Sequence, residues 1–160
     1  MAALPDTLVH ALLDATPVAR LALLGANERP EALPIVFARV ADVLYSPVDG
    51  KPKKSARVAR LAHLERHPAV TLTLDHYADD WQTLWWLKLD VSASVVVDDA
   101  PGWDDAVAAL RGKYPQYATT PLFRGEPTLV VMPYTRVRWW SASGEAGLAH
   151  WLAQRQTKSV

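Results

Sequence analysis

The chain contains no cysteine, which excludes disulfide bonds, thiolate metal sites and a cysteine nucleophile. Basic and acidic residues balance at 17 each, which argues against nucleic-acid binding, where a basic excess is expected. No apolar run is long enough to cross a membrane, and the N-terminus lacks the regions of a signal peptide. We therefore expect a cytoplasmic protein that binds neither nucleic acid nor membrane.

Familiar catalytic motifs are also missing. No serine stands in a nucleophile elbow, and neither a dinucleotide-binding glycine motif nor a Walker loop is present. His63 and His67 are four residues apart, but the glutamate between them is misplaced for a zinc protease, so we expect no metal site. Asp75-His76-Tyr77 with Asp79-Asp80 allows acid–base or metal chemistry, or simply ends a strand before an acidic turn.

Apolar residues and tryptophans are abundant. Half of the 160 residues are apolar and seven are tryptophan. This length is typical of one domain with its own core, so we expect a single domain over residues 1–160. Tryptophan rings pack a core or stack on a planar ligand.

A basic stretch over residues 50–60 precedes and opens a predicted helix over 55–66, for which Ser55 is a suitable N-cap residue. Lys53, Lys54, Arg57 and Arg60 lie at its start, where the helix dipole disfavours cations by about 0.3–1 kcal/mol each. An anion held against them would offset that cost, because backbone N–H groups and basic side chains together bind phosphate. A solvated basic face is the alternative.

Residue periodicity predicts the other elements. They are helices over 4–15 and 101–113, strands over 18–24, 32–39, 42–46, 69–77 and 84–95, a last strand over 128–140 broken near Pro133, and a terminal helix from Gly144. Pro34 cannot donate to a ladder, so it marks an edge, a bulge or a ligand. About six strands with interspersed helices predict a small, mostly antiparallel barrel with helices outside.

The strand over 84–95 has two different faces. One is wholly apolar and must face the core. The other carries Trp86, Lys88 and Asp90. A tryptophan beside a lysine suits an aromatic ring that bears an anionic or carbonyl group, and a subunit interface or a lone exposed tryptophan explains it equally well. Together with the basic helix start, these features suit a phosphorylated planar cofactor that carries the chemistry itself.

Several segments in order resemble the pyridoxamine 5′-phosphate oxidase-like flavin-binding split barrels over about residues 17–140. They are Leu33-Pro34-Ile35-Val36, Leu44-Tyr45-Ser46, the basic helix start, residues 61–70 and Trp86-Leu87-Lys88-Leu89-Asp90. A branch of probable F420-dependent enzymes is most similar, through the Lys-Pro-Lys stretch, Asp75-His76-Tyr77 with Asp79-Asp80-Trp81, the Leu-Trp-Trp, and Tyr114-Pro115-Gln116-Tyr117.

The resemblance implies a mainly β fold, a six-stranded antiparallel split β-barrel with an N-terminal helix and a C-terminal tail helix. It also implies a homodimer with two sites for FMN or coenzyme F420 at the subunit interface. By position, cofactor phosphate, ring and ribityl contacts are expected from Lys51, Lys53, Lys54, Arg57, Leu33, Pro34, Ile35, Val36, Tyr45, Ser46, Trp86, Lys88, Arg138 and Trp140.

The chain also departs from the oxidases. It lacks their Arg-x-Val-Leu-Leu-Lys pattern and their C-terminal substrate segment, which argues against pyridoxamine-phosphate oxidase activity. We expect an FMN- or F420-dependent oxidoreductase that transfers a hydride between the cofactor and a small unsaturated substrate. Tyr45 and His76 are the candidate proton donors, and no catalytic residue is assigned. The alternative function is a non-catalytic protein that binds or sequesters flavin or haem.

Overall fold

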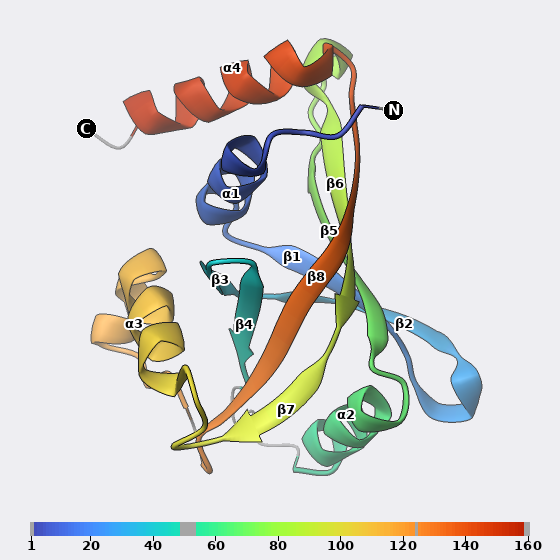
Figure 1. The fold of residues 1–160 in the computed structure, drawn as a ribbon, viewed down its shortest axis with the longest axis vertical. Coiled ribbons are helices and arrows are strands. Elements are labelled where there is room, and N and C mark those ends of the chain that lie inside the picture. The colour runs from blue at the N-terminus through green and yellow to red at the C-terminus, as the bar shows by residue number, and fades with distance from the viewer. Residues whose placement is uncertain (1, 49–53, 124, 159–160) are drawn as a thin grey trace.

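A computed structural model describes residues 2–48, 54–123 and 125–158 (Figure 1). Its helices are α1 (Asp6–Ala15), α2 (Lys54–Arg66), α3 (Trp103–Lys113) and α4 (Gly144–Thr157), with 3₁₀ turns η1 (Ala26–Glu28), η2 (Trp81–Thr83) and η3 (Pro115–Ala118). Its strands are β1 (Ala19–Leu24), β2 (Pro30–Ile35), β3 (Ala38–Val40), β4 (Val43–Pro47), β5 (Ala69–His76), β6 (Trp85–Ser92), β7 (Ser94–Val97) and β8 (Thr128–Ser141).

The strands form one antiparallel sheet in the order β2-β1-β5-β6-β8-β4-β3, with β7 also paired to β8. The long strand β8 joins the two parts of this sheet. Its second half pairs with β6, and its first half pairs with β4 on one edge and β7 on the other. Figure 1 shows β8 running along most of the molecule.

The predicted fold class is confirmed, since the chain forms a mainly β split barrel with peripheral helices. The predicted number of six strands is wrong, because the described residues contain eight. Two predicted strands, over 32–39 and 84–95, are each divided in two.

The break between β2 and β3 is made by Tyr114, which lies far away in the sequence. Its hydroxyl accepts a hydrogen bond from the Phe37 N–H at 3.0 Å and lies 2.8 Å from the carbonyl oxygens of both Phe37 and Pro17, to one of which it donates. A side chain thus satisfies backbone groups that a strand partner would otherwise engage. The chain therefore leaves the sheet at Phe37.

The break between β6 and β7 lies at Ala93. The Ala93 N–H donates to the carbonyl oxygen of Pro68 at 2.8 Å, instead of to a neighbouring strand. A register shift between Asp90 and Val91 precedes it. Such bulges bend a strand and increase its twist. The chain then continues as β7 against the first half of β8.

The predicted break near Pro133 is not present, because β8 is continuous from Thr128 to Ser141. Pro133 is the last residue of β8 that pairs with β4. On the other edge it lies between the residues paired with β7 and those paired with β6. A residue without an N–H is tolerated where a strand changes partners.

Two apolar clusters form the interior. The main cluster lies between the sheet and helices α1, α2 and α4, and includes Leu12, Leu64, Trp85 and Leu148, all fully buried. Each such side chain contributes about 1.5–3 kcal/mol of hydrophobic free energy. The second cluster packs α3 against β3 and the start of β8, through residues such as Leu110 and Leu129.

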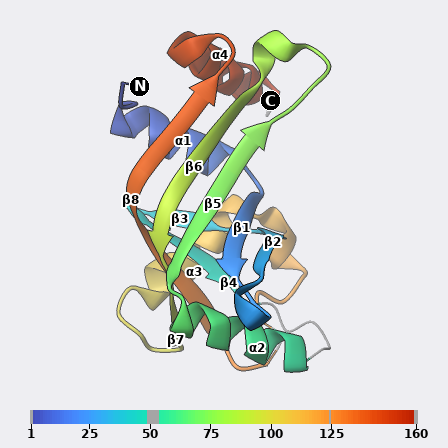
Figure 2. The same ribbon diagram turned by 90° about the vertical axis from the view of Figure 1, so that its right-hand side faces the viewer.

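Helices α1, α3 and α4 lie to one side of the sheet in Figure 1, and Figure 2 shows strands β8, β6, β5 and β1 in front of them. The opposite face of these strands, turned toward the viewer in Figure 2, is called the outer face below. Among the described helices, none is both long and apolar enough to cross a membrane.

Candidate functional site

The predicted alternation of strand β6 is confirmed. Trp85, Leu87 and Leu89 are fully buried in the main cluster. Successive side chains of a strand point to opposite faces, so Trp86 and Lys88, which are half-buried, belong to the outer face. The outer face therefore carries the polar half of β6.

A row of aligned residues crosses five strands on the outer face. Directly opposed residues of antiparallel strands share one face. Pro34 of β2 is opposite Arg20, and Arg20 is also opposite Thr73. Thr73 is opposite Lys88, and Lys88 is opposite Arg138. The outer-face row thus holds three cations and three of the predicted cofactor residues.

Two tryptophans lie beside this row. Trp86 is opposite Asp75 of β5 on one side and Trp140 of β8 on the other. The Lys88 ammonium lies 4.8 Å from the centre of the Trp86 ring, a cation–π contact. Trp140 is 39% exposed. Four predicted residues, Trp86, Lys88, Arg138 and Trp140, are therefore brought together.

Two carboxylates of the outer face are engaged in ion pairs. Arg20 Nη1 lies 2.9 Å from Asp75 Oδ1, and the Arg138 guanidinium pairs with Asp90. Exposed pairs of this kind contribute little stability. Within the described residues, Lys88 has no carboxylate partner and the buried Nε atom of Arg138 has no hydrogen-bond partner. The outer-face row therefore carries a net positive charge, and one of its hydrogen-bond donors has no partner among the described residues.

The remaining predicted ring and ribityl residues do not all lie on this face. Leu33 and Ile35 pack against the main cluster, whereas Val36 and Tyr45 pack against the second cluster. Ser46 is buried, and its hydroxyl donates to the Val36 carbonyl oxygen at 2.7 Å. These five residues thus pack toward the interior of the barrel and not on the outer face.

The predicted phosphate-binding residues lie partly outside the described residues. Lys51 and Lys53 fall there. The predicted basic helix is confirmed to within one residue, because α2 begins at Lys54 and Arg57 is in its first turn. Ser55, predicted as the N-cap, is one residue inside the helix.

Neither candidate proton donor lies on the outer face. His76 is opposite Trp85, on the core side of β5, and its ring lies 6.0 Å from that of Trp151. The Tyr45 hydroxyl is directed toward Gly102, at the start of α3, where an added Cβ would lie 3.4 Å from it. Within the described ranges, no group of three or more histidine, aspartate or glutamate residues is placed to hold a metal ion.

Sequence reasoning missed Arg20 and Thr73, although both belong to the outer-face row. The burial of β1 alternates strictly, with Ala19, Leu21 and Leu23 buried and Arg20 exposed. This alternation is visible in the sequence and would have placed Arg20 on the outer face. Its pairing with Asp75, 55 residues away, was not predictable from local pattern.

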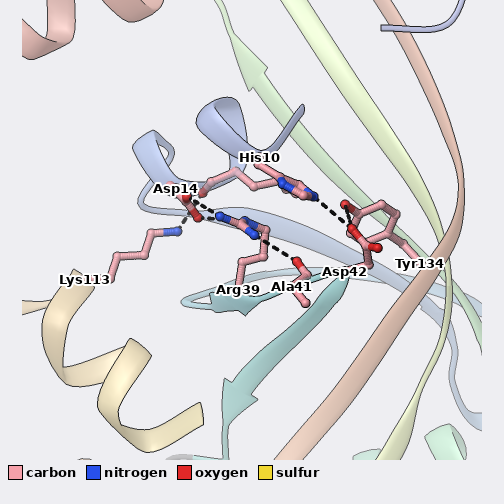
Figure 3. Close-up of polar contacts among 8 residues, drawn as sticks. His10, Asp14, Arg39, Ala41, Asp42, Lys113 and Tyr134 are labelled. Carbon is pink, nitrogen blue, oxygen red and sulfur yellow. Dashed lines mark hydrogen bonds and ion pairs between the residues drawn. The ribbon is translucent and has the colours of Figure 1, made fainter. Parts of the chain in front are cut away.

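A second group of polar residues, shown in Figure 3, connects α1 to strand β3 and the turn that follows it, to β8 and to α3. The Arg39 guanidinium donates to both carboxylate oxygens of Asp14, at 3.0 and 2.6 Å, and to the Ala41 carbonyl oxygen at 2.9 Å. The hydrogen bond with Asp14 raises the pKa of Arg39 above its ordinary value. This bidentate pair fixes α1 to β3.

Asp42 is the second centre of this group (Figure 3). It lies 2.9 Å from His10 Nε2 and accepts a hydrogen bond from the Tyr134 hydroxyl at 3.3 Å. The hydrogen bond with His10 lowers the pKa of Asp42 below its ordinary value. Burial raises the pKa of Tyr134 to about 12. Both contacts hold the β3–β4 turn against α1 and β8.

Lys113 completes the group from α3 (Figure 3). Its ammonium donates to the Leu13 carbonyl oxygen at 2.9 Å and lies 3.7 Å from the centre of the Phe37 ring. Burial lowers the pKa of Lys113 to about 8. This group links four elements of the barrel, and its contacts are those of a structural support.

Comparison with models of known protein families finds no match, and no curated protein matches the chain. Solved structures do match. The hypothetical protein Rv2991 of Mycobacterium tuberculosis superposes with a TM-score of 0.67 at 15% identity, over 88% of this chain and 86% of that protein. HutZ, the haem storage protein of Vibrio cholerae, has a TM-score of 0.65 at 16% identity, over 85% and 93%.

A FAD-binding protein of Mesorhizobium loti has a TM-score of 0.60 at 17% identity, over 85% of this chain and 92% of that protein. At these identities the comparisons establish the fold. The chain shares the split-barrel fold of structures whose names describe haem or flavin binding.

Proposed function

We propose that this protein binds a planar cofactor, FMN or coenzyme F420, on the outer face and acts as an oxidoreductase. The observation that carries the proposal is the outer-face row, in which Lys88 and Arg138 lie opposite each other beside the paired tryptophans Trp86 and Trp140. This arrangement offers flat aromatic surfaces and cationic donors on one open face.

The residues of the outer face fit such a cofactor. The buried Arg138 Nε atom lacks a partner among the described residues, and an acceptor supplied by a ligand would satisfy it. Lys88 is free of carboxylates within the same residues and stands over an aromatic ring. In the proposed complex, these two cations hold anionic or carbonyl groups of the cofactor, while Trp86 and Trp140 cover its ring. The basic start of α2 holds its phosphate.

A bound flavin or deazaflavin supplies hydride transfer, and the protein needs to provide binding, orientation and electrostatics. Lys88 and Arg138 stabilise negative charge on the ring and fix its orientation. Trp86 and Trp140 limit the access of water to the covered side. Asp75 and Asp90 are engaged with Arg20 and Arg138, so they keep these guanidinium groups in place.

The proposal includes a homodimer. The outer face has no cover from α1, α3 or α4 (Figure 2), and it carries a half-exposed tryptophan, Trp140. A second copy of the chain on this face would bury Trp140 and enclose the cofactor between the subunits.

A second candidate is a protein that binds or sequesters flavin or haem without turnover. It is favoured by the state of two outer-face carboxylates, because Asp75 and Asp90 are both paired with arginines and neither is free to act as an acid or base. The names of the similar structures, a haem storage protein and a FAD-binding protein, support the same class of ligand.

One experiment tests both candidates. The purified protein is titrated separately with FMN, F420 and haem, followed by absorption and fluorescence. The bound, reduced cofactor is then mixed with added acceptors. Saturable binding of FMN or F420 and reoxidation faster than for the free cofactor support the oxidoreductase. Binding without faster reoxidation supports the second candidate, and binding of none of the three contradicts both.

A further inference from the structure

The turn that joins β5 to β6 carries two exposed aromatic side chains. Tyr77, which follows β5, is 68% exposed, and Trp81 of η2 is 76% exposed. These are the highest values among the large apolar side chains of the described residues. We call residues 77–84 the β5–β6 tip; it lies beside α4 in Figure 2. Aromatic residues are enriched at protein interfaces, so the tip is a candidate contact surface.

Hydrogen bonds hold the β5–β6 tip in one conformation. The Asp80 carboxylate accepts a hydrogen bond from the Gln82 N–H at 3.0 Å, and the Thr83 hydroxyl donates to the Asp80 carbonyl oxygen at 2.7 Å. The Ser143 hydroxyl, just before α4, donates to the Gln82 carbonyl oxygen at 2.7 Å. A rigid turn loses little conformational entropy when it binds a partner. Trp81 is therefore preorganised as a contact residue.

The β5–β6 tip is also acidic. Residues 77–84 contain Asp79 and Asp80 and no basic residue. Asp80 caps η2, whereas Asp79 is exposed and has no ion-pair partner within the described ranges. A surface that complements the tip must offer a cation next to a depression that accepts an aromatic ring.

The outer face has such a depression at the other end of β5 and β6. Its volume is about 480 Å³, within the range of roughly 300–1,000 Å³ that is typical of small-molecule sites. We call it the outer-face hollow. Thr71 lines it and precedes Thr73 of the outer-face row by two residues, so both side chains point to the same face. Its other outer-face residues are Ala69, Asp90, Ser92 and Thr135.

A cation stands beside the outer-face hollow. Arg136 of β8 is exposed and lies opposite Asp90, so the two share the outer face. It follows Thr135, which lines the hollow. The Asp90 carboxylate is paired with Arg138, and Arg136 has no ion-pair partner among the described residues. The hollow and Arg136 therefore complement the tip in both charge and shape.

The β5–β6 tip and the outer-face hollow lie symmetrically about the outer-face row. On β5, Tyr77 is four residues after Thr73 and Ala69 is four residues before it. At about 3.3 Å per residue, each lies about 13 Å from the row along the strand direction. A two-fold axis along the row, between two copies that face each other, places the tip of each copy over the hollow of the other. The contact then forms twice and the dimer is closed.

We propose that the β5–β6 tip of a second copy of this chain binds in the outer-face hollow, with Trp81 in the hollow and Asp79 against Arg136. The inference rests on the homodimer of the proposed function and names the contact that forms it. The tip cannot reach the hollow of its own chain, because the two lie at opposite ends of the same strands. Since the outer-face row lies between them, the two contacts enclose the cofactor site from both ends.

Cross-linking locates the contact directly. The chain has no cysteine, so Ala78→Cys places a single thiol on the tip and leaves its acids and aromatic rings unchanged. The thiol is labelled with benzophenone maleimide, and the variant is mixed with isotope-labelled unmodified protein, so that links between chains are recognised by mass. We expect links between chains to residues 68–71, 90–92 or 135–136. Ala108→Cys, at an exposed position of α3, is the control and should form none of these links.

Substitutions test the chemistry of the contact, with the dimer dissociation constant measured by sedimentation over a dilution series. Trp81→Ala should weaken the dimer at least about tenfold, because buried aromatic residues dominate interface energies. Asp79→Lys should weaken it about tenfold, since it opposes two cations. Adding Arg136→Glu to Asp79→Lys should restore the affinity. Arg111→Glu, at an exposed cation of α3, is the matched control and should not restore it.

Links from Ala78→Cys only to the tip of the other chain, or to another part of it, would overturn the inference and leave the homodimer standing. Failure of Arg136→Glu to restore Asp79→Lys, or an unchanged dimer in Trp81→Ala, would overturn it as well. A monomeric unmodified protein would overturn both the inference and the homodimer. Cofactor titration is a separate measurement, so absence of cofactor binding contradicts the proposed function without changing what the cross-links show.

Discussion

Lys88 of β6 lies directly opposite Arg138 of β8, so that two cations share one face of the sheet next to the Trp86–Trp140 pair. Neighbouring like charges repel each other by a few tenths of a kcal/mol or more. The carboxylate of Asp90 compensates Arg138, and the Lys88 ammonium stands over the Trp86 ring. A cation in this position is a suitable partner for an anionic or carbonyl group of a ligand.

The first prediction concerns Lys88→Gln. Because Lys88 has no carboxylate partner among the described residues, its removal leaves no buried charge unpaired, and stability should change by less than about 0.5 kcal/mol. If Lys88 contacts the cofactor, FMN or F420 should bind more weakly by about 1.5–3 kcal/mol, the contribution of a charge-assisted hydrogen bond. Fluorescence titration measures this difference, with Arg111→Gln as control. Equal affinity of Lys88→Gln and the unmodified protein would remove Lys88 from the proposed site.

The second prediction concerns the basic helix start. Lys53→Ala combined with Lys54→Ala should weaken binding of a phosphorylated cofactor by several kcal/mol, because each charge-assisted bond to phosphate contributes about 1.5–3 kcal/mol. Riboflavin, which lacks the phosphate, should bind the variant and the unmodified protein equally. A similar loss for FMN and riboflavin would mean that the two lysines do not act on the phosphate.

The third prediction concerns Tyr114→Phe, which removes the hydroxyl that replaces a strand partner at Phe37. The backbone N–H of Phe37 then loses its acceptor in a buried position. Leaving such a group unsatisfied costs about 1–3 kcal/mol. Urea unfolding should show this loss of stability, whereas Tyr77→Phe, at a tyrosine that is 68% exposed, should change stability by less than about 0.5 kcal/mol. Equal stability of the two variants would show that the hydroxyl does not hold the β2–β3 junction.

Some features of this fold could be predicted from the local sequence pattern, and others could not. Alternation in β6 correctly separated Trp85 from Trp86, because burial of one face follows from local pattern. The break at Phe37 could not be predicted in this way, because its cause is a hydroxyl 77 residues away. The extent of β8 was predicted to within one residue, but the predicted break near Pro133 was wrong, since a proline disrupts a strand only where a backbone N–H is needed for pairing.

The candidate site was also predicted only in part. Trp86, Lys88, Arg138 and Trp140 were predicted and do share the outer face, because β6 and β8 pair in the register that their alternation allows. Val36, Tyr45 and Ser46 were predicted for the same site, yet they pack toward α3 or bond to one another. Strand alternation does not show on which side of the barrel wall a residue at a strand junction will lie.

The fourth prediction concerns pH. Burial lowers the pKa of Lys113 from 10.5 to about 8, so between these values the unfolded chain holds more protons than the folded chain. Stability contributed by this group therefore rises with pH in that window. From about pH 7.5 to about 9.5 we expect a rise of about 1–2 kcal/mol, reduced by partial solvent screening.

Lys113→Met isolates this effect, since methionine keeps the apolar stem and cannot be protonated. The unfolding free energy is measured in urea at each pH for both proteins. The value for the unmodified protein minus the value for Lys113→Met should increase as pH rises. A difference that stays constant with pH would show that the Lys113 amine has its ordinary pKa in the folded protein.

The fifth prediction concerns the proposed homodimer. If a second copy covers the outer face, Trp140 is buried in the dimer, and Trp140→Asp places a charge in an apolar contact, which costs several kcal/mol. Sedimentation velocity should then show a dimer for the unmodified protein and a monomer for Trp140→Asp. Val97→Asp introduces the same charge at a 50% exposed position at the end of β7 and should remain dimeric.

Because the cofactor is proposed to lie between the subunits, Trp140→Asp should also bind FMN or F420 at least tenfold more weakly. A monomeric unmodified protein that still binds cofactor would place the whole site within one chain and would remove the homodimer from the proposal.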